Sequence, residues 1–477
     1  MNLPNEAAPR QAAGAVIAET GWAGEIRTTF ALAWPLIIAQ VAQIAFFTTD
    51  VIFLGWLGPS YLAAGTLATA LMHPLVVGGF GVVLATAPMV AQAIGAHDTR
   101  SIRRTVRQGF WAAILLSVVI VPVLYAAPMI FAALGQAPGT VAGASLFIAY
   151  AAWSVPPALL FMVLRSFIAA KGNSGVILAI TLTAVALNAL FNYALVFGNF
   201  GMPRLELMGS GISTSLTNLL MFAAALAYAV TDRGYRRHHI LVRFWKPDWP
   251  RFFEFFRIGM PIGLTLMSEV GLFGVAVIMM GWLGTNEVAA HAVAIQCAAI
   301  SFMVPLGLSQ ATTIRVGLAQ GAVRPRRVAV AGWTSLGLTL IFMSMTCAAF
   351  LLLPVQLAAI FLDPSKPENA ASVALAVSYL GVAALFQVVD GAQVSMAASL
   401  RGLSDTRVPM LVALVGYWIV GLATAYVCGF VLQWRGVGIW FGLAAGLAFV
   451  AVVLTARWSM RERLGLVARP AALSPSP

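Results

Sequence analysis

The sequence predicts an all-α membrane protein in which twelve transmembrane helices form two six-helix bundles related by a pseudo-two-fold axis along the membrane normal. Three observations support this prediction. The 477-residue chain is 61% hydrophobic and only 9% charged, whereas soluble domains carry about 25% charged residues. Its apolar stretches are long enough to cross a bilayer, which needs roughly 18 residues or more. The first half of the chain is also repeated in the second half.

The apolar stretches lack the alternating pattern of a membrane strand, so we expect helices. Counting them along the chain gives twelve expected spans: 30–55, 62–94, 107–134, 141–169, 175–198, 207–231, 256–283, 289–320, 328–361, 372–400, 408–433 and 436–457.

The repeat is clearest at the start of each half. Met260–Gly284 aligns with Trp34–Gly58 without a gap, so that Pro261 meets Pro35 and the motif GWLG occurs in both copies. Each copy holds six expected spans, and an even number returns the chain to its starting side. The two bundles should therefore share one orientation, a duplication typical of transporters whose sites lie near the midplane.

The charge pattern predicts the topology. Arginine-rich loops follow the second, sixth, eighth and tenth spans and end the chain, whereas the opposite loops hold only Arg204, Lys366 and Arg435. By the positive-inside rule both termini are cytoplasmic, in a multi-pass protein of the cell inner membrane. The net charge of +12 then reflects topology, and we expect the lipid bilayer and no nucleic acid as a partner.

The same pattern predicts the domain organisation. Residues 1–27 lack a cleavable signal pattern, so the first span is expected to direct insertion. The expected parts are a cytoplasmic N-terminal segment (1–27), an N-terminal bundle (28–231), a cytoplasmic linker (232–255), a C-terminal bundle (256–457) and a cytoplasmic tail (458–477).

Three acids lie inside expected spans: Asp50, Glu269 and Asp390. A charge at the bilayer centre costs roughly 2.5–3.5 kcal/mol, and such residues usually mark ion or proton pathways. Each acid occurs in one copy of the repeat only, which favours an added function over a packing need of the fold. A structural ion pair is the alternative, but Arg165 and Arg315 are the only basic candidates within spans, both toward cytoplasmic ends.

Asp50 has expected neighbours. Asn188 and Asn192 are four residues apart and share a helical face, and Thr214 lies in the next span among Ser210, Ser213 and Thr217. A carboxylate with amide and hydroxyl oxygens suits a small hard cation such as Na+, and the same carboxylate, desolvated, is able to carry a proton. Both readings stay open, as does simple interhelical hydrogen bonding by the asparagines.

Two further residues are weaker candidates for a substrate cleft. His291 opens the eighth span and is either a structural hydrogen bonder or a titrating group. Gln296 either lines a cleft or packs against a neighbour. No Walker A lysine, HExxH or GxSxG motif occurs, so we expect neither an enzyme nor a bound cofactor. A monomer is expected.

Several stretches together resemble the multidrug and toxic compound extrusion (MATE) transporters, most closely their NorM-like branch. They are TTDVIFLGWLG, LNALFNYALVFGNFGMP, EVAAHAVAIQ and ATTIRVGLAQGA. The resemblance implies cation binding, with Na+ as a candidate ion, at Glu269 and Asp390. It implies a first site where Asp50 works with polar residues of the fifth span, although Asn192 stands where a related branch carries an acid.

The same resemblance implies secondary antiport of small organic cations against Na+ or H+ by alternating access. The alternative is a flippase for lipid-linked oligosaccharides, which shares this general architecture. A flippase is expected to have a strongly basic central cavity, and the sequence places mainly acidic charges within its spans, which suits cationic cargo better.

Overall fold

The computed structural model describes residues 21–242, 244–246, 248–363 and 365–468. Residues 1–20 of the expected N-terminal segment and residues 469–477 of the expected tail lie outside this part of the chain. The described residues contain helices and turns but no strand. Twelve helical stretches are long and apolar enough to cross a membrane, which confirms the predicted all-α class and the number of spans.

The spans follow one another with short connections. In the first half they are α2 (Trp22–Leu57), α3 (Pro59–Val83) with α4 (Thr86–Gly95), α5 (Thr99–Tyr125), α7 (Pro138–Ala151) with α8 (Val155–Ala170), α9 (Ser174–Phe197) and α10 (Glu206–Thr231). In the second half they are α12 (Trp249–Leu283), α13 (Thr285–Gly321), α14 (Pro325–Leu352), α16 (Ala370–Gly402), α17 (Arg407–Leu414) with α18 (Leu422–Tyr426), and α19 (Arg435–Ser459). Short helices are α6 (Ala127–Ala133), α11 (Arg233–Arg236) and α15 (Pro354–Ala359).

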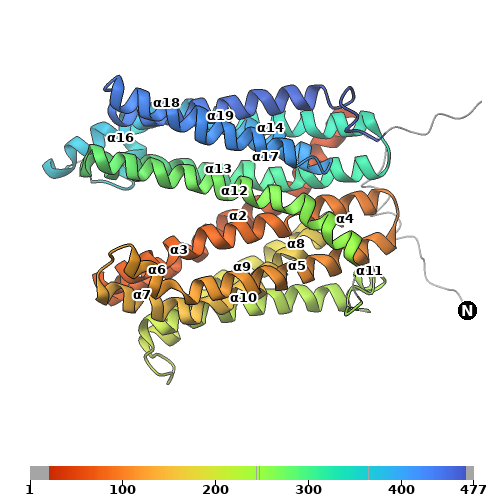
Figure 1. The fold of residues 1–477 in the computed structure, drawn as a ribbon, viewed down its shortest axis with the longest axis horizontal. Coiled ribbons are helices and arrows are strands. Elements are labelled where there is room, and N and C mark those ends of the chain that lie inside the picture. The colour runs from red at the N-terminus through yellow and green to blue at the C-terminus, as the bar shows by residue number, and fades with distance from the viewer. Residues whose placement is uncertain (1–20, 243, 247, 364, 469–477) are drawn as a thin grey trace, which may run out of the picture. The chain divides into compact units, whose positions relative to one another are not determined.

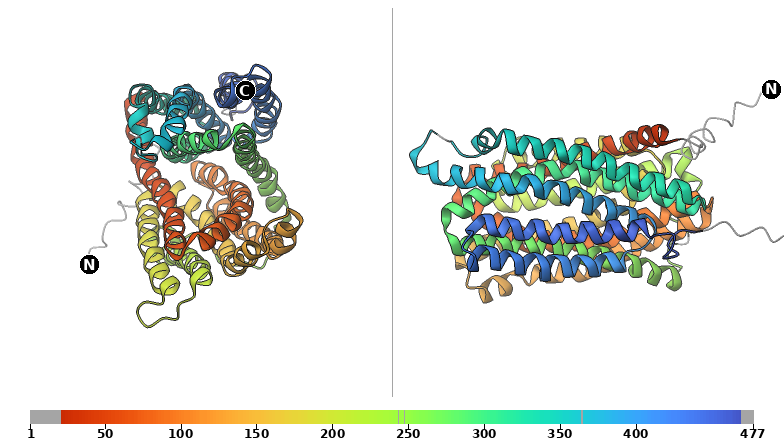
Figure 2. Two further views of the ribbon diagram at one scale, coloured as in Figure 1. Left: turned by 90° about the vertical axis from the view of Figure 1, so that its left-hand side faces the viewer. Right: turned by 90° about the horizontal axis from the view of Figure 1, so that it is seen from above.

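The chain divides into two compact units, each built from long helices that run side by side (Figure 1). Of the described residues, the first unit contains 38–263 and the second contains 21–37 with 264–468. Seen along their axes, the helices of each unit form a bundle (Figure 2). The division falls inside α2 and inside α12, in both cases two residues after the repeated proline. The boundaries expected from the linker stay a prediction, and α12 begins within that linker, at Trp249.

The repeated GWLG motif ends one span and begins the next. Its last glycine has φ 136° at Gly58 and φ 143° at Gly284, a region that side chains with a Cβ rarely adopt. Each glycine directly precedes a helix, α3 or α13. The repeat therefore conserves a sharp reversal between neighbouring spans.

The third span begins earlier than the sequence predicts. Asp98 caps α5 by accepting a hydrogen bond of 2.9 Å from the Ser101 main-chain N–H. The arginines from Arg100 to Arg107, expected in a loop, therefore lie in the first turns of α5. The N-cap carboxylate satisfies a free helix N–H, so the helix extends beyond the apolar stretch.

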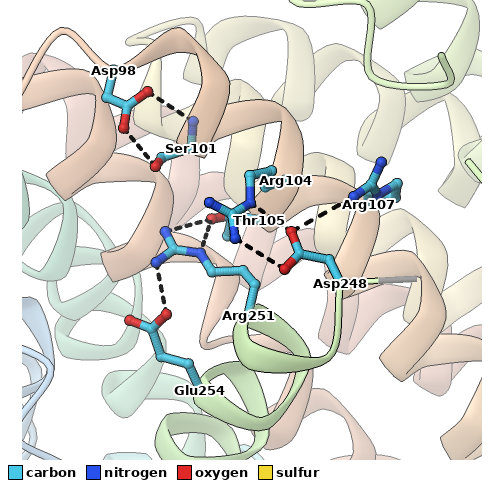
Figure 3. Close-up of polar contacts among 8 residues, drawn as sticks. All are labelled: Asp98, Ser101, Arg104, Thr105, Arg107, Asp248, Arg251 and Glu254. Carbon is cyan, nitrogen blue, oxygen red and sulfur yellow. Dashed lines mark hydrogen bonds and ion pairs between the residues drawn. The ribbon is translucent and has the colours of Figure 1, made fainter. Parts of the chain in front are cut away.

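These arginines hold the start of α12 within the first unit (Figure 3). Arg104 donates two hydrogen bonds to Asp248, at 2.5 and 2.9 Å, and Arg107 lies 3.7 Å from the same carboxylate. Arg251 donates to Thr105 Oγ1 at 3.0 Å and pairs with Glu254 at 2.8 Å. Hydrogen bonding from Arg104 lowers the pKa of Asp248 below its usual value of 3.8.

The linker also docks on the first unit around Lys171. The Lys171 ammonium donates to the Gly234 main-chain oxygen, lies 3.1 Å from His238 Nε2 and sits 4.2 Å from the centre of the Tyr235 ring. Burial lowers the pKa of Lys171 to about 8. Burial, and then the charge of Lys171, lower the pKa of His238 to about 4.

Candidate functional site

The structure brings Asp50 together with the polar side chains expected to surround it. Asp50 lies on α2, Asn192 on α9 and Thr214 on α10. Asn192 Nδ2 donates to Asp50 Oδ1 at 2.8 Å, and the Thr214 hydroxyl donates to Oδ2 at 3.0 Å. The Asn188 side chain also interacts with this carboxylate. Three helices of the first unit therefore meet at one acid.

Amide and hydroxyl oxygens on the helices that meet at this carboxylate have unused hydrogen-bonding capacity. Asn188, Asn192 and Ser210 are fully buried, and Asn188 Oδ1, Asn192 Oδ1 and Ser210 Oγ have no hydrogen-bond partner among the described residues. Buried polar atoms are rarely left in this state unless a site requires it. A carboxylate with amide and hydroxyl oxygens is chemically able to hold a small hard cation or a proton.

The other two acids lie in the second unit, Glu269 on α12 and Asp390 on α16. Asp390 is buried, and its Oδ1 has no hydrogen-bond partner among the described residues. The two carboxylates interact electrostatically with each other and with the hydroxyl of the buried Tyr417. Gln393 Nε2 donates to the Tyr417 hydroxyl at 2.6 Å. Two acids thus share one buried polar region, which favours capture of a positive ion.

The two arginines considered as ion-pair partners for the intramembrane acids, Arg165 and Arg315, contact other residues instead. Arg315 pairs with Glu25 at 2.5 Å, and Arg165 donates to Gln40 Oε1 at 2.6 Å. Arg401, expected in a loop, belongs to α16 because this helix continues to Gly402, and its charge interacts with Glu269. Within the described ranges none of the three acids forms an ion pair with an arginine, lysine or histidine.

The expectation that charges within the spans are mainly acidic is wrong for the buried ones. The described chain buries charged side chains of both signs: Glu25, Glu287, Asp390, Arg107, Arg165, Arg315 and Arg461. Most of these are neutralised locally, as Arg315 is by Glu25 and Glu287 is by Arg435. What distinguishes Asp50 and Asp390 is therefore the lack of an ion-pair partner, which a count of charges does not reveal.

His291 and Gln296 do not lie together. His291 is buried on α13, where its ring lies 5.4 Å from the Trp440 ring and both ring nitrogens lack a hydrogen-bond partner. The expected structural hydrogen bond of His291 is thus absent from the described residues. Gln296 is exposed on another side of the same helix. A role of either residue in a substrate cleft stays a prediction.

Sequence reasoning missed Glu25 and Glu287. Glu25 precedes the expected first span, and Glu287 lies in the short connection before the eighth. In the structure α2 begins at Trp22 and α13 at Thr285, so both acids belong to membrane-spanning helices. Both acids lie outside the apolar stretches, so the signal that identifies them is the charge and helix-capping pattern of the connecting segments.

Two helical units from a duplicated chain, with intramembrane acids in each, are typical of membrane transporters. The family model MatE matches residues 35–194 and 261–427. The chain belongs to this family, the MATE transporters, and to its NorM-like branch. It is therefore a multi-pass membrane transport protein.

Relatives match over almost the full length. A "Probable multidrug resistance protein NorM" of Mesorhizobium japonicum is 46% identical, with 95% of this chain and 97% of that protein covered. A protein of the same name from Brucella suis is 45% identical over 94% and 96%. Among solved structures, the eukaryotic MATE transporter AtDTX14 has a TM-score of 0.83 at 19% identity, covering 92% and 97%. An outward-facing MATE transporter of the MOP superfamily gives 0.83 at 18%, covering 96% and 98%. The structures support the fold alone.

Proposed function

We propose that this protein is a multidrug efflux antiporter of the cell inner membrane, which exports small organic cations in exchange for Na+ or H+. The observation that carries the proposal is that each unit contains at least one intramembrane acidic residue with no ion-pair partner among the described residues. The names of the relatives support multidrug transport. Both termini are proposed to be cytoplasmic because of the arginine distribution, and the protein is proposed to act as a monomer.

The proposed mechanism is alternating access. A cation that enters from outside binds Asp50 or the Glu269–Asp390 pair and favours the state that releases substrate. The cation must bind the two states unequally, because equal binding shifts no equilibrium. One net charge moving through ~100 mV supplies about 2.3 kcal/mol, and a tenfold ion gradient adds about 1.4 kcal/mol. Exchange of one monovalent cation for another retains only the chemical part.

The Glu269–Asp390 pair suits this cycle for an electrostatic reason. Two carboxylates that share a buried region repel each other, so the pair gains free energy when one positive ion enters. A cationic substrate and the coupling ion then compete for the same negative charge, and Arg401 limits the excess charge on the pair. Carboxylates are also suitable ligands for Na+, so the choice between Na+ and H+ rests on experiment.

The test uses the purified protein in proteoliposomes and ethidium as the substrate. A sodium gradient alone or a proton gradient alone should drive ethidium uptake, and Asp390→Asn and Glu269→Gln should abolish it at unchanged protein level. The matched control is Glu368→Gln, an exposed acid of the loop before α16, which should transport normally. If neither gradient moves any organic cation with the wild-type protein, the antiporter proposal is wrong.

A further inference from the structure

The outer half of the second unit contains several buried polar groups without hydrogen bonds. They lie on α13, α16 and α19, near the helix ends that the charge pattern assigns to the outside. His291, Tyr379 and Trp440 are each buried to within 1% exposure. Both ring nitrogens of His291, the Tyr379 hydroxyl and Trp440 Nε1 have no hydrogen-bond partner among the described residues.

These groups follow one another turn by turn along the three helices, from the outer helix ends toward the middle of the unit. In the outer layer the Tyr379 hydroxyl lies against Gly436, where an added Cβ would be 1.9 Å from it, and it interacts electrostatically with Glu287 and Arg435. One turn inward from Glu287 on α13 is His291, whose ring is tilted by 54° against the Trp440 ring, with centres 5.4 Å apart. Trp440 lies one turn further along α19 than Gly436.

The layers continue to Asp390. Trp440 contacts Phe386, with ring centres 5.6 Å apart, and Gln387 follows Phe386 on α16. Gln387 Nε2 donates to the Ser301 hydroxyl, while its Oε1 has no hydrogen-bond partner in the described chain. Gln387 and Asp390 are three residues apart and therefore neighbours on one helix face. Tyr379 and Asp390 are separated along α16 by about 16 Å, at 1.5 Å per residue.

Packing does not explain this arrangement. Each buried polar group left without a partner costs about 1–3 kcal/mol, and apolar residues of the same shape would fill a purely structural core at lower cost. Phenylalanine in place of Tyr379 would keep the ring and remove the cost. The His291 imidazole and the Tyr379 phenol are therefore best explained by a role that depends on their polar atoms.

We propose that Glu287, Tyr379, His291 and Gln387, which we call the outer polar file, conduct protons between the outer surface and Asp390. The proposal rests on the proposed antiport and assigns H+ as an ion that reaches this acid. A neutral imidazole accepts a proton on one nitrogen and releases the proton of the other, which leaves the second tautomer. Rotation of the ring then restores the starting arrangement, so one proton moves with no net change in the side chain. Glu287 begins the file, where its ion pair with the exposed Arg435 reaches the surface.

The lining favours a proton over Na+. A sodium ion without water needs several oxygen ligands, whereas the file beyond Glu287 offers ring nitrogens and two separate side-chain oxygens, those of Tyr379 and Gln387. Its only carboxylate before Asp390 is Glu287, which is already paired. Among the described residues, the charged and titratable side chains on the elements packed around the file include Glu287 and Cys297 on α13, Tyr379 on α16, Arg435 on α19, Cys347 on α14, and Tyr426 and Cys428 in the eleventh span.

The test compares net transport with exchange in proteoliposomes. Tyr379→Phe and His291→Gln should each slow ethidium uptake driven by a proton gradient, without sodium, at least tenfold. Counterflow of ethidium at equal pH, which needs no net proton movement, should stay within twofold of the wild type. The matched control is Tyr426→Phe, an exposed tyrosine of α18, which should be normal in both measurements.

Several outcomes overturn the proposal. Proton-driven uptake at wild-type rate in both variants would show that the file carries no proton. An equal loss of uptake and counterflow would show a structural role of these residues. A wild-type protein driven by sodium only would also refute the proton route, while leaving the antiport proposal intact. Absence of uptake on any gradient would instead refute the proposed function itself.

Discussion

Replacing Arg315 with methionine is expected to destabilise the second unit by about 3–5 kcal/mol, the usual effect of breaking a buried ion pair. Arg315 and Glu25 have side-chain exposures of 6% and 5%, and the guanidinium donates to both carboxylate oxygens, at 2.8 and 2.5 Å. In Arg315→Met the one side-chain hydrogen bond left to the Glu25 carboxylate among the described residues is that from the Thr29 hydroxyl, at 3.3 Å. This loss of stability raises the equilibrium constant for unfolding by a factor of about 100–5,000, because each 1.4 kcal/mol corresponds to tenfold.

The assay is unfolding of the full-length protein by SDS in mixed micelles, followed by circular dichroism. Adding Glu25→Leu to Arg315→Met should recover most of the loss, because replacing both charges by apolar groups removes the uncompensated charge. The control is Arg204→Met, which breaks an exposed pair at 3.3 Å with side-chain exposures of 60% and 36% and should cost less than about 1 kcal/mol. A loss in Arg315→Met no larger than in this control, or a double variant as unstable as the single one, would refute the reasoning.

Three further predictions concern the first unit. The lowered pKa of Asp248 means that its ionised form stabilises the fold above pH ~3.8, so the stability difference between wild type and Asp248→Asn should vanish as pH falls below that value; a difference that persists at pH 2 would contradict this. His238 has a pKa of about 4 against the usual 6.5, so the unfolded chain binds more protons between these values and stability should fall from pH 7 to pH 5. His238→Phe should reduce that fall, measured by SDS titration at both pH values. Gly58→Ala should destabilise by about 1 kcal/mol or more, because φ is 136° there, whereas Gly55→Ala, at a helical position whose added Cβ meets nothing within 4 Å, should not.

The identity of the spans could be predicted because it depends on local composition. A stretch that is apolar over some 20 residues satisfies its own backbone hydrogen bonds only as a helix when it lies in lipid. The duplication was visible for a similar reason, since Pro35 and Pro261, or the two GWLG motifs, are compared along the chain. The positions of the span ends were predicted less accurately, because N-cap residues such as Asp98 extend helices into polar sequence.

The neighbours of Asp50 were partly predictable. Asn188 and Asn192 share a helical face by their spacing, and Thr214 follows in the next span, so all three were natural candidates. Their approach to one carboxylate depends on the rotation of α9 and α10 about their axes. Helices that are apolar on nearly every side carry little information about this rotation.

The amino-acid sequence by itself determined the membrane-spanning class, the twelve spans, the duplication and the three intramembrane acids, because each follows from residue type and order along one segment. Only the tertiary structure decided which charges neutralise each other, since Glu25 and Arg315 are 290 residues apart and meet only when two helices pack. It also decided that His291 lies against Trp440 and Tyr379 against Gly436, with polar side-chain atoms that have no hydrogen-bond partner in the described part of the chain. The physical reason is that hydrophobicity places a segment in the bilayer, whereas side-chain packing between helices selects the polar atoms that face each other.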